Sequence, residues 1–225
     1  MATDWTEQGF TTPGYSSEMA RKSTGDKGGN NSESSPKMEQ LLTAAANLMA
    51  REGYNQTSIR DVARETGFSL AGMYYYFQSK EDLLYKIQYR TFASLLEEQE
   101  RSYLEGGSAE EKLRRLIQNH LSFYTSHFNE MKICTFELHS LSGDRYSDVE
   151  KLRRRYFRIA AEIVGEILNS GRRRGGGERD IRHYTLFIFG MLNWIFSWYE
   201  PERDAPVEDL GEKLVNLALN GLHGL

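Results

Sequence analysis

The sequence predicts an all-α protein of about nine helices. Only 4 of its 225 residues are proline, so little in the chain interrupts a helix. Apolar residues recur at three- and four-residue spacing over long stretches, which is the pattern of a helix with one buried face. Glycines stand where these periodic stretches stop. The chain therefore divides into successive helices.

Composition limits the class of protein. A chain of 225 residues with 39% apolar and 27% charged residues suits a globular protein of one or two domains. No apolar run approaches the roughly 20 residues of a membrane span, and the N-terminus lacks the pattern of a signal peptide. We therefore expect a cytoplasmic protein without a membrane partner. Its one cysteine, Cys134, excludes an internal disulfide.

Residues 1–35 are rich in Gly, Ser, Thr and Asn and show no periodicity, so we expect a disordered tail. A basic tail could instead enter a DNA minor groove, but Arg21, Lys22 and Lys27 are accompanied by five acidic residues. The first predicted helix covers 37–52 and ends at Gly53.

Residues 57–80 predict a helix-turn-helix. Ser58 can cap a first helix in a capping box with Asp61. Gly67 can take the left-handed conformation that ends this helix, and Ser69 can cap the second. Ser79 then caps the next helix, which completes a three-helix unit.

The remaining periodic stretches predict six further helices. The first of them is long enough to link two domains, and the stretch 178–199 is apolar nearly all round, so we expect it to be buried on most sides. Residues 171–177 predict a flexible loop. The six ranges are 80–104, 108–126, 128–141, 145–170, 178–199 and 206–223.

The second helix of the helix-turn-helix has outward residues that suit DNA, although modestly. Ser69 and the helix N-terminus can bind phosphate, and Ala71 and Gly72 allow close approach to bases. Leu70 can touch a thymine methyl group. Residues 37–86 carry six basic and six acidic side chains, so net charge gives no DNA signal. From residue chemistry alone, a DNA-reading unit and a purely structural hairpin both remain open.

Catalytic and metal-binding patterns are not found. The five histidines form no zinc-binding arrangement, and the Gly175–Gly177 run lacks the preceding strand of a phosphate-binding loop. We therefore expect no enzyme activity, no metal and no cofactor.

Residues 37–86 resemble the DNA-binding domain of the TetR family of transcriptional regulators. The resemblance covers this range without a gap, and the matching stretches are 44–48, 51–54, 57–63, 67–69, 73–77 and 79–84. It implies a DNA-binding domain at 36–84, a ligand-binding and dimerisation domain at 85–225, and a homodimer on a palindromic operator. The residues it implies at bases are Ser69, Leu70, Ala71, Gly72 and Tyr74, and those at phosphates are Thr57, Ser58, Arg60, Tyr75, Tyr76 and Lys80. Leu70 and Gly72 replace polar residues common in the family, which leaves the operator sequence open.

Residues 189–201 resemble the eighth helix of a subgroup that controls fatty-acid or steroid degradation and responds to acyl-coenzyme A. This implies a repressor released by such an effector. A long apolar chain needs an aromatic and aliphatic pocket with a few polar groups. The candidates are His120, Phe123, Tyr124, Phe136, Tyr156, Ile159, Asn193 and Trp194. Asn193 could meet a ligand carbonyl or bond a neighbouring helix instead.

Basic residues follow in the C-terminal half and could meet the phosphates of coenzyme A, or form a solvated face. They are Lys151, Arg153, Arg154, Arg155, Arg158, Arg172, Arg173 and Arg174. The last two predicted helices, with Gly190 and Trp198, suit a four-helix dimer interface. Two alternatives stay open: another hydrophobic effector with control of efflux, and a helical lipid carrier without DNA function.

Overall fold

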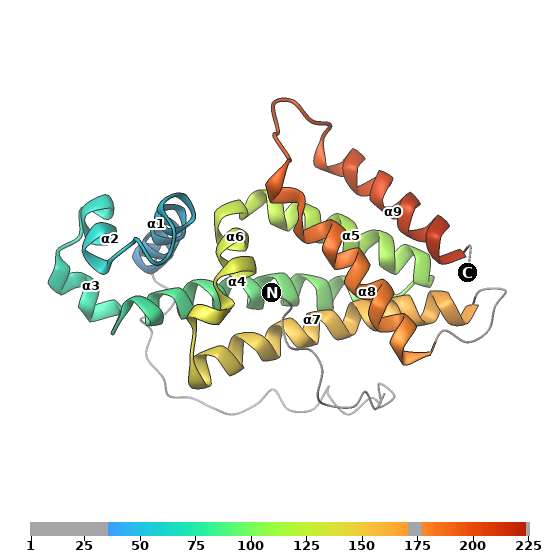
Figure 1. Ribbon diagram of the computed structural model, residues 1–225, viewed down its shortest axis with the longest axis horizontal. Helices are drawn as coiled ribbons and strands as arrows, with labels where there is room; N and C mark the ends of the chain where they lie inside the picture. Colours follow the sequence, from blue (N-terminus) through green and yellow to red (C-terminus); the bar gives the residue numbers. More distant parts are fainter. Residues whose placement is uncertain (1–35, 171–176, 224–225) are drawn as a thin grey trace.

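A long helix, α4 (Lys80–Leu104), connects two groups of helices (Figure 1). The computed structural model describes residues 36–170 and 177–223, and those ranges contain only helices and turns. At one end of the molecule lie α1 (Pro36–Glu52), α2 (Ile59–Thr66) and α3 (Leu70–Tyr76), beside the start of α4. The predicted all-α fold and its N-terminal helix-turn-helix are confirmed.

The turn between α2 and α3 forms as its residues dictate. Ser58 accepts a hydrogen bond from the Asp61 N–H (3.3 Å), and the Asp61 carboxylate accepts one from the Ser58 N–H (2.9 Å). Gly67 has φ 69°, the left-handed conformation that reverses the chain. Ser69 then accepts from the Gly72 N–H at 3.0 Å and starts α3.

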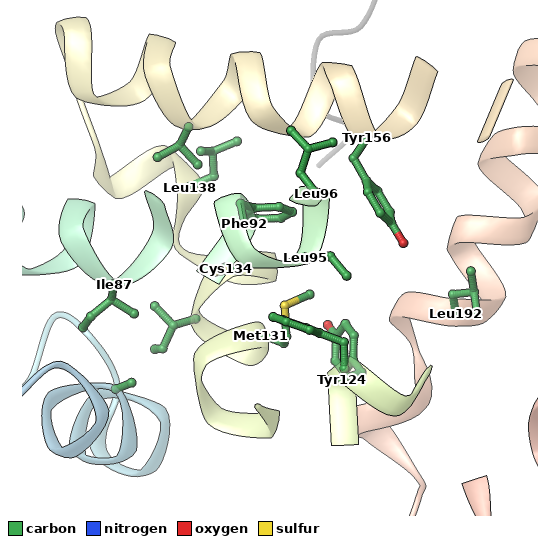
Figure 2. Packing of buried hydrophobic residues seen from close by; sticks show 14 of the residues in the cluster. Ile87, Phe92, Leu95, Leu96, Tyr124, Met131, Cys134, Leu138, Tyr156 and Leu192 are labelled. Atoms are coloured by element: carbon green, nitrogen blue, oxygen red, sulfur yellow. The ribbon is translucent and has the colours of Figure 1, made fainter. Parts of the chain in front are cut away.

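The second group of helices packs around the other end of α4. It comprises α5 (Ala109–Ser126), α6 (Phe128–Phe136), η2 (Leu138–Ser140), α7 (Gly143–Ser170), α8 (Glu178–Asn193), η3 (Ile195–Ser197) and α9 (Val207–His223). Figure 2 shows its core, where Met131 and Cys134 of α6 lie near Leu95 of α4 and Tyr124 of α5. Hydrophobic packing is continuous from this core to Ile87 and α1.

Two predicted helices are wrong in extent. The stretch 128–141 is not one helix, because α6 ends at Phe136 and a short 3-10 turn follows. The stretch 178–199 is helical only to Asn193. The expected burial of this helix is also wrong for the single chain, because Phe187 is 63% exposed and Trp194 60%. The expectations for 1–35 and for the loop 171–176 lie outside the described residues.

Polar contacts join the two groups of helices. Lys132 of α6 donates to the carbonyl of Ala50 at the end of α1 (3.0 Å). Asn129 donates to Asn47 at 2.8 Å. The backbone N–H and hydroxyl of Ser142 both donate to the Glu81 carboxylate at the start of α4, each at 2.8 Å. The α6–α7 region therefore holds both α1 and the first turn of α4.

The left-handed turn at Gly67 gives a stability prediction. An alanine there would place a Cβ in a conformation that costs roughly 1–2 kcal/mol, so Gly67→Ala should lower the free energy of unfolding by that amount. Denaturant unfolding followed by circular dichroism measures it. The matched control is Gly221→Ala, whose helical Cβ would meet open space and should leave stability unchanged or slightly raised. Equal stability of Gly67→Ala and the parent would contradict the turn described above.

Candidate functional site

The exposed face of α3 is aromatic. Tyr74 is 54% exposed and Tyr75 is 78% exposed, while Met73 and Phe77 are fully buried and anchor the helix from beneath. Ala71 is exposed beside them, and Leu70 is partly covered by the core. Tyr76 is half-buried and packs edge-on against Tyr75 (5.1 Å between ring centroids). The helix therefore presents two phenol groups on a rigid, well-anchored frame.

Lys80 is held against the N-terminal helices. Its ammonium donates to the Tyr54 carbonyl (3.0 Å) and lies 4.3 Å from the centre of the Tyr54 ring. A second, longer bond of 3.4 Å reaches the Asn55 carbonyl. Arg60, by contrast, is exposed on the first turn of α2. Lys80 therefore fixes the chain between α1 and α2, and an ammonium has a third hydrogen left to donate.

The structure corrects the predicted phosphate contact of Thr57. Its side chain is only 3% exposed, and its hydroxyl donates to the Gly53 carbonyl at 2.9 Å. The hydroxyl thus closes the turn after α1 and is not presented to a phosphate. The hydroxyl of Ser58 is exposed, but it is engaged with Asp61 at 2.6 Å. The sequence indicated hydroxyl groups at these positions without showing that the fold uses them.

A cavity of about 310 Å³ lies between α4, α5, α6, α7 and α8. Five of the predicted ligand-binding residues line it: His120, Phe136, Tyr156, Asn193 and Trp194. The wall is mostly aromatic and aliphatic, with a few polar groups, as in many small-molecule sites.

Three predicted ligand-binding residues do not line this cavity. Phe123 stacks on His127 at 4.2 Å between ring centroids. Ile159 is buried in the helix packing, with 8% exposure. Tyr124 is one layer back, where it hydrogen-bonds the cavity residue Thr135 at 2.6 Å. Helical periodicity placed all three on inward faces but could not distinguish the packed core from a cavity wall.

His120 is a neutral group in the cavity wall. The side chain is 2% exposed, and its Nδ1 is 3.0 Å from the Tyr156 hydroxyl. Burial lowers the pKa of His120 to about 4, while nearby Asn193 acts in the opposite direction. Its buried Nε2 has no partner of ordinary hydrogen-bond geometry within the described residues, although the Asn193 side chain is close enough to act on the ring. A ligand in the cavity could therefore bond to this atom.

Arg153 is a cavity residue that the sequence did not single out from its basic neighbours. Its guanidinium donates to the Cys134 carbonyl (2.7 Å) and lies 5.0 Å from the centre of the Phe92 ring. Burial holds the pKa of Arg153 below its usual value. A signal was present, because Arg153 stands at helical spacing between the inward Val149 and Tyr156.

An apolar groove of about 740 Å³ runs between α8 and α9. Four of its lining residues are large and exposed: Phe187, Trp194, Trp198 and Leu217. Leu186, Gly190 and Trp194 line both this groove and the cavity, so α8 and the residue after it separate the two. Such a contiguous apolar surface is typical of an interaction face.

No cluster of metal-ligating side chains occurs in 36–170 or 177–223. Burial raises the pKa of the Cys134 thiol to about 12, which disfavours the thiolate form. Within the same ranges, no helix has the length and apolar character that crossing a membrane requires.

Known proteins match this chain along most of its length. Residues 41–87 match the model of bacterial regulatory proteins of the tetR family, and residues 106–222 match the tetracyclin repressor-like C-terminal domain. The fatty acid metabolism regulator protein of Bacillus subtilis is 25% identical over 84% of this chain and 96% of its own. The transcriptional repressor KstR2 of Rhodococcus jostii is 23% identical over 81% and 89%.

Solved structures agree. PfmR, a TetR-family regulator from Thermus thermophilus, is 26% identical with a TM-score of 0.72, covering 80% of this chain and 97% of its own. AibR, solved with isovaleryl coenzyme A and operator DNA, is 25% identical with a TM-score of 0.71, covering 80% and 96%. The Bacillus protein, KstR2 and PfmR are regulators or repressors by name. With both halves of the chain matched in order, the protein belongs to the TetR family of bacterial transcriptional regulators.

Proposed function

We propose that this regulator is a dimeric repressor of fatty-acid or steroid degradation genes, released from DNA by an acyl-coenzyme A. Residues 36–84 read the operator, and residues 85–225 bind the effector and dimerise. One observation carries the proposal: α6 forms part of the cavity wall and also binds α1 of the reading head. One relative is a fatty acid metabolism regulator by name, and a structural neighbour was solved with isovaleryl coenzyme A.

The reading surface consists of α3 and the residues beside it. Ser69, Leu70, Ala71, Gly72 and Tyr74 are proposed to face bases. Phosphate contacts are proposed for Ser58, Arg60, Tyr75, Tyr76 and Lys80. Since α3 itself carries no basic residue, the phenol groups and the helix N-terminus must supply much of the hydrogen bonding.

Tyr74→Ala should weaken operator binding about tenfold, because it removes an exposed phenol that can donate to a phosphate or base. Fluorescence anisotropy with DNA from upstream of the protein's own gene measures the affinity. The matched control is Tyr89→Ala: Tyr89 is 42% exposed but lies on α4 outside the helix-turn-helix. If both variants bind like the parent, the reading-helix assignment is wrong. A parent that binds no upstream DNA would favour a lipid carrier instead.

The groove between α8 and α9 is proposed as the dimer face. In a twofold dimer the same face of both subunits takes part, so one substitution places two charges in the interface. Leu217 is 63% exposed in the single chain and lines the groove, which makes it a suitable site for such a charge.

Leu217→Glu should raise the dimer dissociation constant about a hundredfold or more, since two leucine burials are lost. Size-exclusion chromatography with light scattering measures the oligomeric state. Asn216→Glu is the control, because Asn216 is exposed on the same helix but does not line the groove. A parent that is monomeric at micromolar concentration would refute this assignment of the face.

The effector is proposed to act by shifting α6. A ligand changes the position of the reading heads only if it binds one arrangement better than another. In the cavity it would contact Met131, Thr135 and Phe136 of α6. Lys132 and Asn129 on the same helix hold α1, so a displacement of α6 moves the head or releases it.

Acyl-coenzyme A should release the protein from operator DNA at low-micromolar concentration, and the corresponding acid should do so poorly. Competition anisotropy with pairs matched in chain length tests this. Lys132→Met is the coupling variant: it should bind the effector like the parent but require more of it for release. Equal release by thioester and acid would remove coenzyme A from the proposal and favour another hydrophobic effector.

A further inference from the structure

Arg153 differs from the basic residues around it on α7. Lys151 pairs with Asp148 at 2.9 Å, Arg154 pairs with Glu150 at 2.6 Å, and Arg155 pairs with Glu100. For Arg153, no carboxylate of the described residues lies within ion-pair distance. Three basic residues of this stretch thus pair with carboxylates and Arg158 is exposed, whereas Arg153 lines the cavity.

The partners of Arg153 leave most of its hydrogen-bonding capacity unused. A guanidinium has five N–H donors, whereas Arg153 makes one hydrogen bond, to the Cys134 carbonyl, and one cation–π contact, with the Phe92 ring. Glu150, three residues earlier on the same helix, favours the charged form of Arg153 from a distance, but its carboxylate is in contact with Arg154 and not with Arg153. A largely buried charge without a counter-ion is costly, so the site favours a molecule that brings one.

The other polar groups of the cavity do not supply this charge. His120 is neutral there, and its Nε2 has no partner of ordinary hydrogen-bond geometry within the described residues. Thr135 and Asn193 are uncharged side chains in the same wall. The described cavity wall therefore carries a net positive charge inside an aromatic enclosure.

We infer that Arg153 recognises a carboxylate carried at the buried end of the effector chain. Arg binds a carboxylate through two parallel hydrogen bonds, which the unused donors permit. The inference rests on the proposed function, in which the other end of the chain is a coenzyme A thioester. The effector would thus be a dicarboxylic acid with one carboxyl group joined to coenzyme A and the other free. Such compounds arise when a ring is opened oxidatively or when the far end of an acyl chain is oxidised. A carboxylate could also come from an unesterified acid, and the experiment separates these two sources.

The cavity volume determines which chain length a test ligand should have. At roughly 30 Å³ per chain atom, taken from the volume of a water molecule, 310 Å³ holds about ten atoms. Three eight-carbon probes suit it: octanoyl-coenzyme A, the mono-thioester octanedioyl-coenzyme A, and octanoic acid. Direct binding to the full-length protein is measured by calorimetry and by quenching of tryptophan fluorescence, since Trp194 lines the cavity.

Octanedioyl-coenzyme A should bind the parent at least about tenfold more tightly than octanoyl-coenzyme A, as expected for a charge-assisted hydrogen bond. Arg153→Met, which keeps an unbranched apolar stem but removes the guanidinium, should abolish or reverse this preference. Arg154→Met is the matched control and should retain it, because Arg154 does not line the cavity. Arg153→Lys should keep part of the preference, and thermal unfolding checks that each variant is folded.

The remaining outcomes separate the two proposals. Tighter binding of octanoic acid than of both thioesters, lost in Arg153→Met, would keep the carboxylate site and overturn the acyl-coenzyme A effector. Octanoyl-coenzyme A binding as well as the dicarboxylic probe, with no change in Arg153→Met, would overturn the carboxylate site and leave the proposed function standing. Absence of binding by all three probes would overturn both.

Discussion

The carbonyl groups at the C-terminal ends of helices organise this fold. The last four carbonyls of a helix have no partner within it and must be satisfied elsewhere. Lys132 binds the Ala50 carbonyl at the end of α1, and Arg153 binds the Cys134 carbonyl at the end of α6. Lys80 binds the Tyr54 carbonyl just after α1. Each cation lies where the helix dipole favours positive charge, and each joins elements far apart in the sequence.

These contacts give α6 a central position between the cavity and the N-terminal helices. The helix has only nine residues, so a large part of it is occupied by contacts with other elements. Met131 and Thr135 line the cavity, Lys132 holds α1, and the carbonyl of Cys134 receives Arg153. Under the proposed function, a ligand carboxylate on Arg153 would compete with or reinforce the bond to Cys134, and so act on the helix that positions α1.

The sequence allowed the local structure to be predicted because caps are local. Ser58, Ser69 and Ser79 each bond a backbone N–H three residues away, so their spacing alone located the starts of three helices. The long-range roles could not be predicted in this way. The residues next to Thr57 in the sequence do not indicate that its hydroxyl is buried. Those next to Lys80 do not indicate that its partner is the Tyr54 carbonyl. Periodicity identifies an apolar helix face, but a packed core, a cavity wall and a surface that binds another chain all require such a face. For this reason Phe123 was expected in the cavity wall but packs in the core. For the same reason α8 was expected to be buried within the single chain.

The composition of α3 explains why head position would be an effective control. Leu70 and Gly72 contribute few directional contacts, and the helix has no basic side chain. Each head alone would therefore bind DNA weakly, and affinity would depend on both heads engaging at once. Linked binding of this kind is lost when geometry forbids simultaneous contact. Under the proposed function, a small shift of α6 in each subunit would suffice for release, because it would need to change only the spacing of the heads and not the contacts of either one.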